Sequence, residues 1–258
     1  MASLSVVVAP VVRLRRWGYV GAALARLKAQ LCGRFALILD GRRVECELPG
    51  RQGRLLAAFL LANRLRTVTR EQAIEAIWTS GRDGGLAPLL SKVRRVLPLD
   101  GLRPVADELW IDVESAADAL HRAESALALG DAHRAWAPAQ VALFVCGRRF
   151  LADEEGEWIE AERTRLAALR VRALEAYAGA TLGVGGTELA AAVRSARTLV
   201  RLEPYRESGY RLLMEALERE GNPAESLLVY EELRGRLRDE LGVSPSAETQ
   251  ALHRRLLR

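Results

Sequence analysis

Apolar positions change their spacing several times along the first half of the chain, which indicates strands mixed with short helices. The run RFALILDGRRVECEL, residues 34–48, contains two β-prone stretches on either side of Asp40-Gly41, a dipeptide that favours a tight hairpin turn. The stretches 51–63 and 70–78 instead repeat apolar residues every three or four positions, as one face of a helix does. This pattern predicts a hairpin followed by two helices.

The second of these helices has a clear start signal. Thr69 and Gln72 form the Thr-x-x-Gln pattern of a capping box, in which the hydroxyl and the side-chain amide each satisfy the hydrogen-bonding needs of the other residue's backbone. We therefore expect this helix to begin at Arg70.

A third helix is predicted for LAPLLSKVRRVLP, Leu86 to Pro98, which follows a glycine-rich linker. Pro88 has no backbone donor and is tolerated only in a first helical turn, so the helix should start at the first or second residue of this stretch. About twelve residues would extend roughly 18 Å, enough to cross a major groove. The alternating run ELWIDV, residues 108–113, predicts a closing strand. Hairpin, three helices and strand are the order of a winged helix-turn-helix over residues 34–113.

Residues 1–33 form an N-terminal extension in which five apolar positions recur at helical spacing. This spacing predicts an amphipathic helix that packs on its own domain, with a membrane surface or a partner as the alternative uses. The five positions are Trp17, Val20, Leu24, Leu27 and Leu31.

After residue 113 the strand signals stop, and residues 114–258 are predicted to be an all-α domain. Helix pairs separated by glycine and proline resemble the roughly 34-residue helix-turn-helix units of tetratricopeptide arrays, although the spacing here is longer and irregular. The fold class is therefore mainly α with a small β component, a winged helix-turn-helix followed by a tetratricopeptide-like helical repeat. Helices are expected at 115–129, 131–145, 156–182, 187–203, 205–220, 223–241 and 246–257.

The charge is distributed unevenly between the two predicted domains. Residues 1–113 contain 18 Lys and Arg against 10 Asp and Glu, whereas residues 114–258 contain 20 against 23. A basic half joined to a mildly acidic half suggests a polyanion-binding module fused to a second domain.

Double-stranded DNA is the polyanion that a winged helix would bind, with the third helix in the major groove. Arg94 and Arg95 carry the planar guanidinium that can meet a guanine edge with two hydrogen bonds, whereas Lys92 suits phosphate and Ser91 suits either. Further cations near helix starts and the wing are candidates for backbone contacts, with a solvated surface as the equal alternative. These are Arg51, Arg54, Arg70 and Arg103.

Nothing in the sequence favours catalysis, a cofactor or a metal. The run DEEGEWIEAE, residues 153–162, has six carboxylates but no histidine or phosphate loop beside it, so we interpret it as an acidic helix start. The histidines are isolated, and GVGGTE lacks the lysine of a phosphate-binding loop. We expect the protein not to be an enzyme.

The compartment is predicted from what the sequence lacks. No apolar run approaches the length of a membrane span, and SVVVAPVV is followed rather than preceded by basic residues, unlike a signal peptide. Cys32, Cys46 and Cys146 have no metal-like spacing and suit a reducing compartment. We expect a cytoplasmic bacterial protein, associated with the nucleoid and without a membrane partner.

Four stretches of the sequence resemble a known family. PYRESGYRLLMEALEREGNPAESLLVYEELRGRLRDELGVSPSAETQALHRRLL, residues 204–257, closely resembles the bacterial transcriptional activator domain, and LADEEGEWIEAERTRLAALRVRALEAYA, residues 151–178, resembles the segment before it. LPGRQGRLLAAFLLANRLRTVTREQAIEAIW and LLSKVRRVL resemble the winged helix of the SARP-type regulators. The stretch between Pro98 and Trp110 leaves room only for a short wing, with Arg103 as its one basic residue.

The resemblance implies a sequence-specific transcription factor. Members bind DNA repeats through the third helix, commonly as two copies side by side, and contact RNA polymerase to activate promoters. The alternative is a scaffold of helical repeats whose winged helix no longer binds DNA, and a weaker alternative is a regulator with a ligand pocket among its helices.

Overall fold

The computed structural model describes residues 26–78 and 85–258. The winged helix contains a four-stranded sheet. Its strand order is β3-β2-β1-β6, with β2 and β3 joined by the predicted turn at Asp40-Gly41, where both residues have positive φ. The central strand β1 pairs antiparallel with β2 and parallel with β6. The strands are β1 (Arg26–Gln30), β2 (Ala36–Leu39), β3 (Arg42–Arg43) and β6 (Glu108–Ile111).

Strand β1 corrects the prediction of an amphipathic helix in residues 1–33. Leu27, which was expected on the apolar face of that helix, lies in the strand, opposite Leu39 on one side and Leu109 on the other. Leu27 and Leu31 are both buried, and a spacing of four residues fits the face of a helix and the face of a strand equally well. The rest of the expected helix lies outside the described residues.

The three helices of the winged helix form in the predicted order. The capping box is present, because Gln72 N donates to Thr69 Oγ1 (3.3 Å) and Thr69 N donates to Gln72 Oε1 (3.1 Å). Most of the linker predicted before the third helix falls on residues 79–84, outside the described residues. The helices are α1 (Gly50–Ala62), α2 (Arg70–Ile77) and α3 (Leu86–Val93), preceded by the short 3₁₀ helix η1 (Glu45–Glu47).

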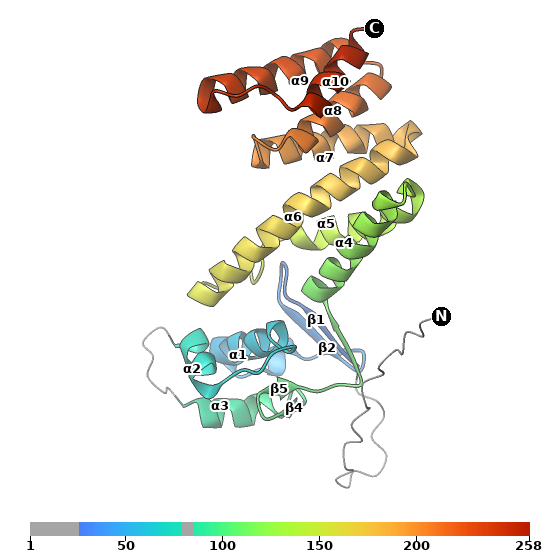
Figure 1. Ribbon diagram of the computed structural model, residues 1–258. Coiled ribbons are helices and arrows are strands. Elements are labelled where there is room, and N and C mark those ends of the chain that lie inside the picture. Colours follow the sequence, from blue (N-terminus) through green and yellow to red (C-terminus); the bar gives the residue numbers. More distant parts are fainter. Residues whose placement is uncertain (1–25, 79–84) are drawn as a thin grey trace, which may run out of the picture.

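The wing is as short as the sequence predicted. It consists of β4 (Leu99–Asp100) and β5 (Arg103–Pro104), paired antiparallel around a two-residue turn. Gly101 occupies the turn with φ +61°, a conformation that glycine adopts without strain. The wing follows α3 directly and lies beside it (Figure 1).

Helices then run to the C-terminus in close agreement with the predicted ranges. They stack as an array that rises away from the winged helix, so that the C-terminus and α3 lie at opposite ends of the molecule (Figure 1). No helix among the described residues combines the length and the apolar composition that crossing a bilayer requires. The bounds are α4 (Asp112–Ala128), α5 (Ala132–Cys146), α6 (Glu157–Val184), η2 (Gly186–Glu188), α7 (Leu189–Leu202), α8 (Glu207–Arg219), α9 (Pro223–Arg236), η3 (Leu237–Leu241) and α10 (Ala247–Leu256).

Asp112 corrects the predicted end of the closing strand. The strand stops at Ile111, and Asp112 is the first residue of α4, where its carboxylate is completely buried. It accepts hydrogen bonds of 2.9 Å from the backbone N–H groups of Leu31, Cys32 and Val113. Burial raises the pKa of Asp112, while these three donors act to lower it. A carboxylate at this position favours a helix start, which explains why the strand does not continue to residue 113.

The winged helix and the helical array share one hydrophobic core. Phe150, Leu151 and Ile159 of the array are buried in the same cluster as the residues of α1 and the sheet. The backbone continues this contact, because Gly33 N donates to the carbonyl oxygen of Arg149 and Leu151 N donates to that of Leu31, each at 2.8 Å. The two domains therefore meet through a packed junction.

A tryptophan of α6 strengthens this junction. The Trp158 ring lies edge-on to Phe59 of α1, with centroids 5.2 Å apart, and edge-on to Phe150 at 5.9 Å. Its indole Nε1 donates to the carbonyl oxygen of Ala76 in α2 (3.0 Å). Trp158 therefore joins both of the first two winged-helix helices to the array.

Candidate nucleic-acid interface

Helix α3 presents one buried and one exposed face. Its leucines and Val93 are buried against the winged-helix core, as the apolar spacing predicted. Ser91 and Lys92 are exposed on the opposite face, together with Ala87 and Pro88. The small apolar residues were not among the predicted contacts, although an exposed alanine on such a face can pack against a thymine methyl group.

The helix is shorter than predicted. It ends at Val93, so its eight residues extend about 12 Å instead of roughly 18 Å. Arg94 and Arg95 lie in the turn that follows, where Arg95 N donates to the carbonyl oxygen of Lys92 (3.2 Å), a tighter i to i−3 hydrogen bond. Both arginine side chains are exposed, so the basic residues remain on the outer side of the domain.

Arg94 has a partner inside the domain. Its Nη2 donates to the carbonyl oxygen of Gly101 in the wing turn (2.9 Å). No hydrogen bond or ion pair is seen for the side chains of Lys92 and Arg95 among the described residues. The two adjacent arginines therefore differ, because one is bound to the wing and the other is open to solvent.

Arg70 and Arg103 lie outside α3, on α2 and on the wing. Arg70 is the exposed first residue of α2, and Arg103 is exposed on β5 of the wing. A polar groove of about 320 Å³ separates the wing from the loop before α2, and Arg103 and Arg66 both line it. Arg66 was missed by the sequence analysis, although the basic run NRLRT between two predicted helices is the signal that could have indicated it.

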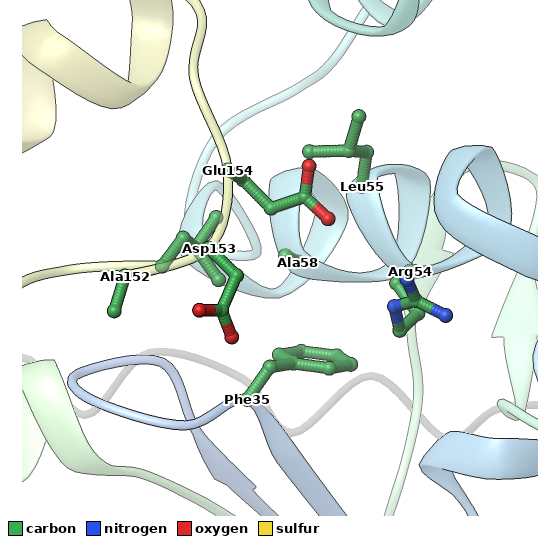
Figure 2. A pocket seen from close by; sticks show the side chains of 8 residues that line it. Phe35, Arg54, Leu55, Ala58, Ala152, Asp153 and Glu154 are labelled. Carbon is green, nitrogen blue, oxygen red and sulfur yellow. The ribbon is translucent and has the colours of Figure 1, made fainter.

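Arg51 and Arg54 lie elsewhere, at the domain junction. Arg51 Nε is 2.6 Å from Glu154 Oε2, an ion pair between α1 and the loop before α6. Arg54 lines a small cavity of about 70 Å³ between α1 and that loop, where Asp153 and Glu154 also point (Figure 2). The eight predicted residues are thus divided, with six around α3, α2 and the wing and two beside the helical array.

The acidic run 153–162 is part of the same junction. Arg163 donates to the carbonyl oxygens of Phe150, Leu151 and Glu154, and its guanidinium also pairs with Glu155 and Glu160. These carboxylates are held by arginines, and none of the described residues forms a His, Cys, Asp or Glu group arranged to hold a metal ion. The run therefore stabilises the loop between α5 and α6.

The fold is a winged helix with exposed basic residues at its outer end, fused to a helical-repeat domain. The model of the bacterial transcriptional activator domain matches residues 111–257. Regulatory protein AfsR of Streptomyces griseus is 33% identical over 220 residues, which cover 80% of this chain and 22% of that protein. AfsR of Streptomyces coelicolor is 33% identical over 231 residues, which cover 84% of this chain and 23% of that protein.

A solved structure has the same fold. Mycobacterium tuberculosis EmbR, in complex with a low-affinity phosphopeptide, aligns with a TM-score of 0.71 at 24% identity, covering 90% of this chain and 65% of that one. The chain belongs to the SARP-type transcriptional regulators, which carry the bacterial transcriptional activator domain. It spans less than a quarter of the length of the AfsR proteins that it matches. The family is regulatory rather than enzymatic.

Proposed function

We propose that this protein is a sequence-specific DNA-binding regulator that activates transcription at bacterial promoters by recruiting RNA polymerase. The observation that carries the proposal is the exposed face of α3, on which Ser91, Lys92 and Arg95 project from a helix fixed by its buried leucines. Such a face suits the major groove, and its position at the end opposite the C-terminus leaves it free to approach a duplex (Figure 1). Acting on chromosomal DNA would place the protein at the nucleoid, in the cytoplasm.

Within this proposal the basic residues have different roles. Arg95, which is open to solvent, reads a base edge, most favourably guanine, and Ser91 donates to a base or a phosphate. Lys92, Arg70 and Arg103 contact phosphates, which supply most of the affinity without sequence preference. An eight-residue helix covers less of the major groove than a longer one does. Few base contacts therefore determine the preference for one DNA sequence over another.

The other predicted contacts are assigned to positioning. Arg94 holds the wing beside α3 through Gly101 and so acts through the position of Arg103. Arg51 is engaged by Glu154, and Arg54 lies on the same side of α1. We assign these two residues to the domain junction instead of the duplex.

RNA polymerase and a second copy of the chain are the proposed protein partners. The helical array follows the winged helix without a free linker, because β6 ends at Ile111 and α4 begins at Asp112. Two copies on repeated sites would therefore hold their arrays at defined positions beside the promoter.

The decisive experiment selects bound fragments from random or genomic DNA and then measures affinity for the selected site as a function of salt. Each phosphate contact predicts a log–log slope of about −0.9, so several contacts give a steep dependence. A slope near zero would contradict DNA binding and favour the scaffold of helical repeats instead.

Variants of α3 test the assignment of roles. Arg95→Ala should relax preference at particular base positions, whereas Lys92→Ala should weaken binding to all sequences alike and reduce the salt slope by about one unit. The matched control is Arg201→Ala, an exposed arginine on α7, far along the array, which should leave binding unchanged. If Arg95→Ala and Lys92→Ala reduced DNA affinity equally for all sequences, Arg95 would not be the residue that reads a base.

A further inference from the structure

The first helical pair of the array, α4 and α5, carries apolar side chains on its outer face. Leu129 is 80% exposed, Phe144 is 67% exposed and Val141 is 46% exposed. The inner faces of the same helices are buried against α6 through alanines such as Ala123 and Ala139. The terminal unit of a helical array normally has a polar outer face, because no further unit covers it. The apolar outer face therefore departs from what solubility alone requires.

Leu129 and Val141 line a groove between the two helices. Its volume is about 580 Å³, and its apolar part is formed by Ala126 of α4, by Leu129 directly after that helix, and by Ala137, Pro138 and Val141 of α5. Phe144 lies one turn beyond Val141 on α5 and continues the apolar stripe. From Arg134 to Phe144 the helix rises about 15 Å, which is the length of roughly three turns of an added helix.

The ionisable residues that line this groove are all of the basic type. His121, Arg122 and Arg134 line it, and no carboxylate does. Neither arginine forms an ion pair with a carboxylate of the described residues, whereas Glu124 on the far side of α4 is paired with Arg172 of α6.

Two neighbouring carboxylates do not change this pattern. Asp118 is exposed one turn before Arg122, outside the groove lining. Asp131 is engaged as the cap of α5, where it accepts a hydrogen bond from Arg134 N (2.9 Å). Beyond the groove, Arg148 lies over the Phe144 ring, 4.6 Å from its centroid, and its Nη2 is 4.0 Å from the carboxylate of Asp112.

We propose that the α4–α5 groove binds an acidic amphipathic helix of a partner protein. A helix laid in this groove would cover the apolar floor with its own apolar face, as in other helix-in-groove complexes. Its flanking carboxylates would meet Arg122 and Arg134, which have no partner of their own in the described structure. The site lies in the helical array and is separate from the DNA-facing end, so it stands independently of the proposed DNA binding.

The experiment uses the full chain and two synthetic probes. The first is a fluorescein-labelled peptide of about fourteen residues, roughly 20 Å when helical, with leucines on one face and glutamates flanking them. The second has lysine in place of each glutamate and is otherwise identical. Fluorescence anisotropy should show that the chain binds the glutamate peptide at least about tenfold more tightly than the lysine peptide. Equal affinity for both peptides, or no binding to either, would overturn the proposal.

Variants locate the binding. Leu129→Asp should reduce affinity for the glutamate peptide at least about tenfold, since it places a carboxylate in the apolar floor facing the acidic partner. The matched control is Leu228→Asp on α9, another leucine that is largely exposed (69%), which should bind as the wild type does. The double variant Arg122→Glu, Arg134→Glu should reverse the preference toward the lysine peptide. Unchanged binding by Leu129→Asp, or an unchanged preference in the double variant, would show that the peptide binds elsewhere.

A second copy of the chain is the competing occupant. Sedimentation of the wild type and of Leu129→Asp separates the two cases. If the wild type self-associates and Leu129→Asp abolishes that association, the groove is an interface between copies and the proposal is wrong. A monomer in both cases, together with selective peptide binding, supports it. Circular dichroism of each variant confirms that the helical array is folded.

Discussion

Arg94 and Gly101 join the end of α3 to the turn of the wing through one hydrogen bond of 2.9 Å. The bond spans seven residues of sequence and holds a hairpin whose strands are only two residues long. Because such a hairpin has few backbone hydrogen bonds of its own, its position depends on contacts of this kind.

Replacing Arg94 with alanine should therefore weaken DNA binding through the wing. We expect a loss of about 0.5–1.5 kcal/mol, the net value of one hydrogen bond, with base preferences unchanged. A double-mutant cycle tests this mechanism, because Arg103→Ala should reduce DNA affinity less in the Arg94→Ala background than in the wild type. Arg94→Lys, which keeps a donor, should restore part of the affinity. Additive losses in the cycle would argue that Arg94 contacts DNA directly.

Asp112 should be among the most sensitive positions of the fold. Alanine would leave three buried N–H groups, on Leu31, Cys32 and Val113, without an acceptor. An unsatisfied buried donor costs about 1–3 kcal/mol, so the loss in free energy of unfolding should exceed about 2 kcal/mol. Urea denaturation of Asp112→Ala measures it, with Asp118→Asn, an exposed residue of the same helix, as the control. Wild-type stability of Asp112→Ala would contradict this role.

Gly53 and Gly235 should respond to alanine with opposite signs, although both lie inside helices. Alanine in a helix interior is normally about 1 kcal/mol more favourable than glycine. A Cβ at Gly53 would lie 2.5 Å from Cδ of Pro49, so Gly53→Ala should destabilise the winged helix. A Cβ at Gly235 would meet nothing within 4 Å, so Gly235→Ala should stabilise the array by up to about 1 kcal/mol. Thermal denaturation of both variants tests the pair, and shifts of the same sign would refute it.

The carboxylate of Glu207 should make the free energy of unfolding depend on pH in the acid range. Burial alone would raise the pKa of Glu207, but hydrogen bonds from Ser246 and Thr249 outweigh it and hold the pKa below its ordinary value of 4.5. The unfolded chain therefore takes up the proton at higher pH than the folded chain does. The stabilisation is complete above about pH 4.5 and is lost as the pH falls through the lower folded value. Glu207→Gln should be less stable at neutral pH and lose less stability between pH 5 and 3, as urea titrations at each pH would show.

Local signals explain which elements could be predicted from the sequence. The turn at Asp40-Gly41 and the capping box of Thr69 and Gln72 depend on residues a few positions apart, and both formed as expected. The helices of the array followed from repeated apolar spacing with a turn between each pair. The buried face of α3 followed from the same spacing, so the exposed Ser91 and Lys92 could be named in advance, whereas the exposed Ala87 and Pro88 were not.

Long-range contacts explain what the sequence could not predict. Strand β1 exists because Leu27 and Ala29 pair with β6, some eighty residues later, and nothing near residue 27 indicates that pairing. Asp112 reaches Leu31 across 81 positions, and Arg51 reaches Glu154 across 103. The short wing was foreseeable from the number of residues, but the contact of Arg94 with it was not.

The junction around Trp158 fixes the direction in which the helical array leaves the winged helix. On a duplex, a rigid connection of this kind means that the position of the binding site sets the direction in which the array points around the DNA axis. B-DNA turns once in about 10.5 base pairs, so moving the site by about five base pairs would carry the array to the opposite side of the promoter. Activation should then rise and fall with the helical phase of the site, and not simply decline with distance.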